Sequence, residues 1–81
     1  MDIEILNRTN KIIKQILSEP NLVIDTNTKA SEIPKWDSLS HIEIIASLEK
    51  EFDIKFNFRE IMNFQNIGDL IICIKNHISN K

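Results

Sequence analysis

Apolar residues recur at three- and four-residue intervals in three segments of this 81-residue chain, and this periodicity is what most restricts its fold. The segments cover residues 2–18, 38–52 and 67–79. Such spacing places apolar side chains on one face of a helix, and that face must be buried against other helices. We therefore expect an all-α fold, a small four-helix bundle of three longer helices and one short helix.

The first helix is expected over about residues 2–18, ended by Pro20, which cannot continue a helical hydrogen-bond ladder. Its buried face is predicted to contain Ile3, Leu6, Ile13, Ile16 and Leu17. A long and mostly polar loop follows over residues 19–37. Several apolar residues interrupt its polar sequence, so the loop is predicted to be pinned across the core. These residues are Leu22, Val23, Ile24, Ala30 and Ile33.

The second helix, expected over about residues 38–52, carries two apolar stripes. The wider stripe suits the core and consists of Ile44, Ile45, Leu48 and Phe52. In the other stripe, Ile42 and Ala46 follow Ser38 at four-residue intervals, so they share its side of the helix. An exposed Ile42 would suit a docking surface, whereas a buried Ile42 would simply widen the core face, and the sequence favours neither.

The last part of the chain is expected to form an extended connector over residues 54–56, a short helix over about 58–63 and a final helix over about 67–79. The short helix region supplies apolar cover for one end of the bundle through Phe56, Phe58, Ile61 and Phe64. Asn66 is the predicted N-cap of the final helix, and Gly68 in its first turn permits close packing. The predicted buried face contains Ile67, Leu70, Ile71, Ile74 and Ile78.

Length and charge exclude several classes of function. A single domain of 81 residues has little room for a catalytic apparatus around a substrate pocket, so we do not expect an enzyme. The formal charge of −2, without a basic run, argues against nucleic-acid binding. The N-terminal segment has no basic, apolar leader and no stretch reaches membrane-spanning length, so we expect a cytoplasmic protein without membrane contact. We assume a monomer.

Two site chemistries can be set aside from the residues alone. Asp37, Ser38 and His41 have the residue types of a hydrolytic triad, but they crowd the opening turn of one helix without a pocket or oxyanion site. Cys73 lies in an apolar run and is interpreted as a small buried apolar residue. Because the two histidines are far apart in sequence, they and this cysteine offer no recognisable ligand set, and no metal is expected.

Ser38 lies where the long loop passes into the second helix. Its hydroxyl can be exposed there while the first backbone N–H groups of the helix are free to receive a negative charge. One interpretation is that Asp37 or Ser38 simply caps the helix, and Ser40 with Glu43 has the spacing of a capping box, worth about 1 kcal/mol. The other interpretation is that Ser38 is an attachment point.

The chain as a whole resembles the acyl carrier protein family. Three stretches at the appropriate separations carry this resemblance: Trp36-Asp37-Ser38-Leu39, Leu48-Glu49-Lys50-Glu51-Phe52 and Asn66-Ile67-Gly68-Asp69-Leu70. The resemblance implies that a phosphopantetheinyl transferase attaches a 4′-phosphopantetheine arm from coenzyme A to Ser38. The thiol of the arm would hold acyl groups as thioesters. By the same resemblance, Asp37 would help the transferase to hold its magnesium and coenzyme A.

The second helix is the expected docking surface for the transferase and for acyl-loading and acyl-processing enzymes. Its acidic groups suit basic patches on such partners, although a solvated helix face explains them equally well. The residues predicted to make this surface are Leu39, Ile42, Glu43, Ala46 and Glu49.

Some positions depart from the family pattern. Lys35 stands where family members usually have glycine, next to the bulky Trp36, and Ser40, His41 and Lys50 replace common acidic residues. These departures favour a specialised pathway over general fatty-acid synthesis. Two alternatives stay open: an aminoacyl or peptidyl carrier loaded by an adenylating enzyme, and an unmodified helical interaction module whose Ser38 is only a cap.

The interior of the bundle is a further open question. A gap between the helices would have room for a short acyl chain, although a completely filled core fits the sequence equally well. The residues expected around such a gap are Ile44, Ile45, Leu48, Phe52, Ile61, Ile67 and Ile71.

Overall fold

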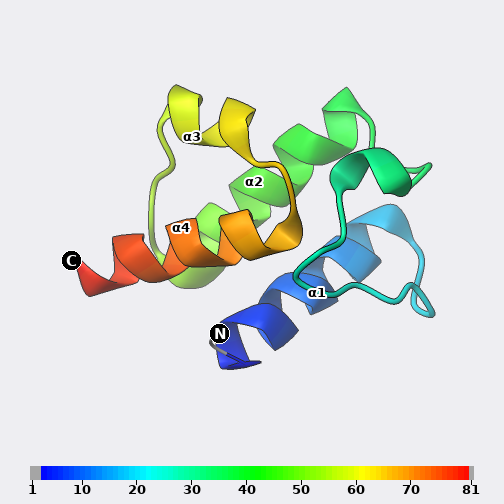
Figure 1. The fold of residues 1–81 in the computed structure, drawn as a ribbon, viewed down its shortest axis with the longest axis horizontal. Helices are drawn as coiled ribbons and strands as arrows, with labels where there is room; N and C mark the ends of the chain where they lie inside the picture. The colour runs from blue at the N-terminus through cyan, green and yellow to red at the C-terminus, as the bar shows by residue number, and fades with distance from the viewer. Residues whose placement is uncertain (1–2, 81) are drawn as a thin grey trace.

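The computed structural model describes residues 3–80, and within that range the chain forms four α-helices and no strand (Figure 1). The helices are α1 (Ile3–Leu17), α2 (Ser38–Phe52), α3 (Phe58–Asn63) and α4 (Ile67–Ser79), with a short 3-10 turn, η1 (Ala30–Glu32), in the long loop. The predicted all-α bundle with one short helix is thus confirmed. Residue 2, where the first helix was expected to begin, lies outside the described residues.

Helix α1 packs against α2 and α4 through a stripe of residues four apart. The buried side chains of this stripe are Ile5, Thr9, Ile13 and Leu17. The predicted face was wrong for Ile3, which is 66% exposed, while Leu6 and Ile16 flank the core. Ile3 is two residues from Ile5 and therefore points away from this stripe, and the polar Thr9 is left out by a search for apolar spacing.

Helix α1 ends at Leu17, before it reaches Pro20. Ser18 adopts the left-handed conformation at φ 55°, and the N–H of Glu19 donates to the carbonyl of Lys14 at 3.0 Å. This is the hydrogen-bond pattern of a Schellman C-cap, so the predicted role of Pro20 as the helix terminator is wrong. Helix α2 ends in the same way, with Asp53 at φ 52°.

The long loop is held against the start of α4 and the middle of α1, as expected for a pinned loop. The backbone carbonyl of Thr28 accepts a hydrogen bond from the N–H of Ile67 at 2.9 Å. The backbone carbonyl of Thr26 accepts one from the N–H of Gly68 at 2.8 Å. A Cβ at Gly68 would lie 3.0 Å from the Thr26 carbonyl oxygen, so glycine permits this close approach. Ile24 and Ile33 are buried, whereas Val23 is exposed.

The core is formed mainly by α2 and α4. The predicted faces of these two helices are buried through Ile44, Ile45, Leu48, Phe52, Ile67, Leu70, Ile71 and Ile74. The exception is Ile78, which is 38% exposed near the end of α4. Phe56 closes one end of the bundle. Ile61 and Phe64 are partly buried and pack against the core. Phe58 does not contribute to this cover as predicted, because it starts α3 with its side chain 77% exposed.

Two adjacent isoleucines of α4 provide a test of this packing. Ile71 is fully buried, whereas Ile72 is 52% exposed. We expect Ile71→Ala to lower the free energy of unfolding by about 2–5 kcal/mol, since it leaves a cavity in the core. Ile72→Ala should change it by about 0.5 kcal/mol or less. Urea unfolding followed by circular dichroism measures both, and equal losses would contradict the described orientation of α4.

Candidate functional site

Asp37 is the N-cap of α2. It has extended backbone dihedrals, and its Oδ1 accepts a hydrogen bond from the N–H of Ser40 at 2.8 Å. This bond, with further contact to the Ser40 side chain, lowers the pKa of the Asp37 carboxyl, so the cap is charged at neutral pH. An ionised carboxylate at a helix N-terminus also interacts favourably with the helix dipole.

Ser38 is the first residue of α2 and is exposed. Because Asp37 caps the helix, the interpretation of Ser38 as the cap is wrong, and no described residue hydrogen-bonds to its hydroxyl. The predicted capping box of Ser40 with Glu43 is also wrong, because Ser40 already lies inside the first turn and its hydroxyl donates to the carbonyl of Lys35 at 3.1 Å. The helix start therefore presents Ser38 as a free, accessible hydroxyl.

His41 is turned toward the loop and α3. Its Nδ1 accepts a hydrogen bond from Trp36 Nε1 at 3.1 Å, and its Nε2 lies 3.2 Å from the carbonyl oxygen of Ile61. With Nδ1 as an acceptor, the proton of the neutral ring is on Nε2 and faces Ile61. Since both ring nitrogens are used, His41 does not serve as a base for Ser38, and the geometry of a triad is not formed.

Lys35 and Trp36 shape the loop just before Ser38. Lys35 Nζ lies 2.9 Å from Glu19 Oε1, and the N–H of Trp36 donates to the carbonyl of Ile33 at 3.0 Å. The ion pair is largely exposed and contributes about 0–1 kcal/mol. The backbone bond and the half-buried Trp36 ring therefore do most to fix this segment.

An open groove of about 590 Å³ lies beside Ser38, between the start of α2, the end of the loop and α3. Two exposed apolar side chains of α3 border it, Phe58 at 77% and Met62 at 65% exposure. Of the residues predicted to surround an internal gap, Ile61 lines this groove, whereas the other six are all buried in the core. The apolar space next to Ser38 is thus at the surface.

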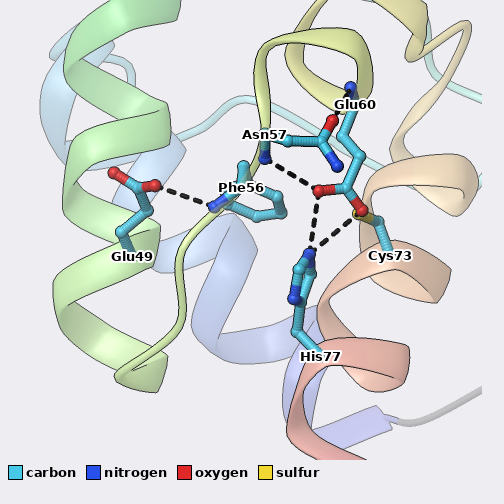
Figure 2. A network of polar contacts seen from close by, with 6 residues as sticks. All are labelled: Glu49, Phe56, Asn57, Glu60, Cys73 and His77. Atoms are coloured by element: carbon cyan, nitrogen blue, oxygen red, sulfur yellow. Dashed lines mark hydrogen bonds and ion pairs between the residues drawn. The ribbon is translucent and has the colours of Figure 1, made fainter. Parts of the chain in front are cut away.

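Four of the five predicted docking residues share the exposed side of α2. Leu39 is 66% and Ile42 65% exposed, and Glu43 and Ala46 are also exposed. Glu49 differs, because it is half-buried and its Oε2 accepts a hydrogen bond from the N–H of Phe56 at 2.8 Å (Figure 2). Its carboxylate holds the connector between α2 and α3.

Comparison with known proteins agrees with this geometry. The family described as "Phosphopantetheine attachment site" matches residues 10–74. An acyl carrier protein homolog of Mycoplasma genitalium is 36% identical over 73 residues, which cover 85% of this chain and 87% of that protein. An acyl carrier protein of Borreliella burgdorferi is 32% identical over 72 residues, covering 89% of this chain and 90% of that protein.

A solved structure shows the same fold. The solution NMR structure of holo acyl carrier protein from Geobacter metallireducens superposes with a TM-score of 0.85 at 33% identity, covering 93% of this chain and 86% of that chain. This chain belongs to the acyl carrier protein family. It is a carrier with a covalently attached phosphopantetheine rather than an enzyme. No helix in the described part of this carrier is long and apolar enough to cross a bilayer.

A second polar cluster of the carrier lies between α3 and α4, and Figure 2 shows its three side chains converging. The thiol of Cys73 donates to Glu60 Oε2 at 3.0 Å, and His77 Nε2 lies 2.9 Å from Glu60 Oε1. Cys73 is half-buried with a polar partner, so its interpretation as a purely apolar residue was wrong. The sequence prediction considered only the separation of the two histidines and overlooked that Cys73 and His77 are four residues apart, on one helix face.

The cluster changes the acidity of two of its members. Burial alone would raise the pKa of Glu60, but hydrogen bonds from Cys73, from the N–H of Asn57 and from His77 together lower it from 4.5 to about 2. Burial, together with the hydrogen bond to the charged Glu60, raises the pKa of Cys73 from 9.0 to about 12. At neutral pH the cluster thus combines a carboxylate with a protonated thiol.

The lowered pKa of Glu60 predicts an acid-sensitive contribution to stability. In the unfolded chain Glu60 takes up its proton near pH 4.5, but in the folded chain only near pH 2. Its contribution is therefore present above pH 4.5 and is lost as the pH falls toward about 2. We expect Glu60→Gln to reduce the fall in unfolding free energy across this interval, measured by urea titration at each pH.

Glu43→Gln is the matched control, since it removes an exposed carboxylate of α2 outside the cluster. This variant should keep the acid dependence of the wild type. If Glu60→Gln kept it as well, the cluster would not be the source of the lowered pKa.

Proposed function

We propose that Ser38 is the residue that carries the 4′-phosphopantetheine arm and that Asp37 assists its attachment. The observation that supports this most directly is the division of roles at the start of α2. Asp37 supplies the cap through its bond to the Ser40 N–H, and the exposed hydroxyl of Ser38 has no structural task. Ser38 can therefore be modified without loss of a bond that holds the helix.

The local electrostatics suit a phosphodiester at this position. Ser38 is at the N-terminus of a 15-residue helix, where the partial positive charge of the dipole favours an anion. The arm supplies a terminal thiol that holds acyl groups as thioesters. The exposed Asp37 carboxylate lies next to the hydroxyl in sequence, where a transferase that binds magnesium and coenzyme A can use it.

The partner enzymes are proposed to dock on the exposed side of α2. Leu39 and Ile42 supply apolar contact area, and Glu43 supplies a negative charge for a basic partner surface. Ala46 extends this surface by one turn. Glu49 is less suited to the docking surface than the sequence indicated, because its carboxylate accepts a hydrogen bond from the backbone N–H of Phe56. Among possible partners, the family implies a phosphopantetheinyl transferase and acyl-processing enzymes in general.

Membership of the acyl carrier protein family argues against the alternative of an unmodified interaction module, and the groove beside Ser38 suits an acyl cargo on the arm. Its lining is mainly apolar, with Ile42, Phe58 and Met62 around the position of Ser38. A specialised pathway and an aminoacyl or peptidyl cargo stay predictions. The same applies to a monomeric state, a cytoplasmic location and the absence of nucleic-acid partners.

The attachment site can be tested by intact mass. We expect the full chain, incubated with coenzyme A, magnesium and a phosphopantetheinyl transferase of broad specificity, to gain the mass of one phosphopantetheine group. Ser38→Ala should gain nothing, because the acceptor oxygen is absent. Ser40→Ala is the control, since it removes the neighbouring hydroxyl and should leave modification intact. A gain that persists in Ser38→Ala would refute the assignment.

Two substitutions separate the roles of Asp37. Asp37→Asn keeps a side-chain acceptor for the Ser40 N–H but removes the charge, whereas Asp37→Ala removes both. We expect both variants to be modified more slowly than the wild type, and Asp37→Ala to lose more thermal stability than Asp37→Asn, which loses only the interaction of the charge with the helix dipole. If Asp37→Asn were modified at the wild-type rate, the carboxylate would act only as a cap.

The docking surface can be tested with two exposed isoleucines. Ile42→Ala should raise the KM of the transferase for the carrier roughly tenfold, because an apolar side chain is buried on docking. Ile72→Ala removes a comparably exposed isoleucine from α4 and should leave the KM unchanged. Unfolding curves of both variants verify that the folds are equally stable. Equal KM values would place the docking surface elsewhere.

A further inference from the structure

The side chains of Glu60, Cys73 and His77 converge from two helices onto one point (Figure 2). Cys73 and His77 project from the same face of α4, and Glu60 faces them from α3. One oxygen, one sulfur and one nitrogen of these residues all lie within 4.8 Å of one another. This cluster stands apart from Ser38, beside the C-terminal end of α2, whereas Ser38 is at the N-terminal end of that 15-residue helix.

The donor set has the composition of a zinc site. Zinc is bound by cysteine sulfur at about 2.3 Å, by histidine nitrogen at about 2.0–2.1 Å and by carboxylate oxygen at about 2.0–2.2 Å. Calcium and magnesium prefer oxygen ligands only, so a site that includes sulfur and nitrogen disfavours them. We propose that Glu60, Cys73 and His77 bind a zinc ion, with water completing the tetrahedral coordination.

The contacts of Glu60 require only a small adjustment. At these bond lengths, neighbouring ligand atoms of a tetrahedral zinc ion lie about 3.4 Å apart. The oxygens of Glu60 are now 2.9–3.0 Å from His77 Nε2 and 3.0 Å from Cys73 Sγ. An ion would therefore replace the hydrogen bonds of Glu60 after these side chains separate by a few tenths of an ångström, while Cys73 Sγ and His77 Nε2, which lie within 4.8 Å of each other, would both turn toward the ion.

The carboxylate is already oriented for this role. The N–H of Asn57 donates to Glu60 Oε1 at 2.9 Å, and Asn57 Oδ1 accepts from the N–H of Glu60 at 2.8 Å. This capping box holds Oε1 and leaves Oε2 directed at the cysteine and histidine. The ring of Phe56 packs edge-on against His77 at 5.6 Å between centroids, which restricts the imidazole as well. Bonds of this kind, made to the ligands themselves, raise metal affinity.

The charges balance when the ion binds. The thiol of Cys73 releases its proton to solvent and coordinates as a thiolate, His77 coordinates as neutral imidazole and Glu60 as carboxylate. Two negative ligands then neutralise the two positive charges of Zn²⁺ in a half-buried place, with side-chain exposures of 28% for Glu60 and 29% for His77. This exposure leaves a path for the ion and room for the water ligand.

Zinc binding would clamp α3 to α4. Helix α3 has only six residues and borders the groove beside Ser38, so a clamp at its first turn would restrict the groove wall. This inference is independent of the proposed arm on Ser38.

The test uses the reduced 81-residue chain and its Ser38→Ala variant in parallel, so that an arm thiol cannot supply the sulfur. Native mass spectrometry with zinc chloride should show one bound ion in both proteins, and the melting temperature should rise with zinc concentration. With cobalt chloride, the spectrum should show thiolate-to-cobalt charge transfer and the visible bands of a tetrahedral ion.

Three variants locate the site. Cys73→Ser should abolish the charge-transfer band, and His77→Gln and Glu60→Gln should weaken zinc binding at least about tenfold. Glu43→Gln is the control and should bind as the wild type does. Circular dichroism verifies that each variant is folded. Absence of a 1:1 zinc complex in the wild type, or binding that persists in Cys73→Ser and His77→Gln, would overturn the proposal.

Discussion

Burial of one face of α2 determines what the rest of the molecule can present. Ile44, Ile45 and Leu48 are almost fully buried, and this fixes the rotation of the helix about its axis. Ser38, Ile42 and Ala46 then point outward together because they are four residues apart on the other side. The proposed attachment residue and the proposed docking surface are thus positioned by the core rather than by contacts of their own.

The fold class and the start of α2 could be predicted from the sequence because they depend on local signals, namely helical periodicity and N-cap residues. Helical periodicity indicated α2 and α4, and Asn66 is the N-cap of α4 as expected, accepting from the N–H of Asp69. Residues whose environment depends on tertiary contact were not accessible in this way. Thr9 lies in the buried stripe of α1 despite its hydroxyl, and Phe58 is exposed despite its ring.

The polar contacts of the site required the structure for the same reason. Nothing local in the sequence pairs His41 with the carbonyl of Ile61, twenty residues away, or Cys73 with Glu60. The four-residue spacing of Cys73 and His77 places them on one helix face, which the sequence prediction overlooked, and the third member comes from another helix. Sequence spacing finds pairs within one helix, whereas a cluster that spans two helices depends on how they pack.

Helix α3 is where these contacts meet. Six residues are too few for a helix to be stable in isolation, so its position depends on its surroundings. Near Ser38 the carbonyl of Ile61 is bound by His41, and at its first turn Glu60 is bound by Cys73 and His77. Ring contacts from Trp36 through His41, Phe64 and Phe56 to His77 join the two ends. Because α3 forms one wall of the groove, any change in these bonds alters the space next to Ser38 without touching Ser38 itself.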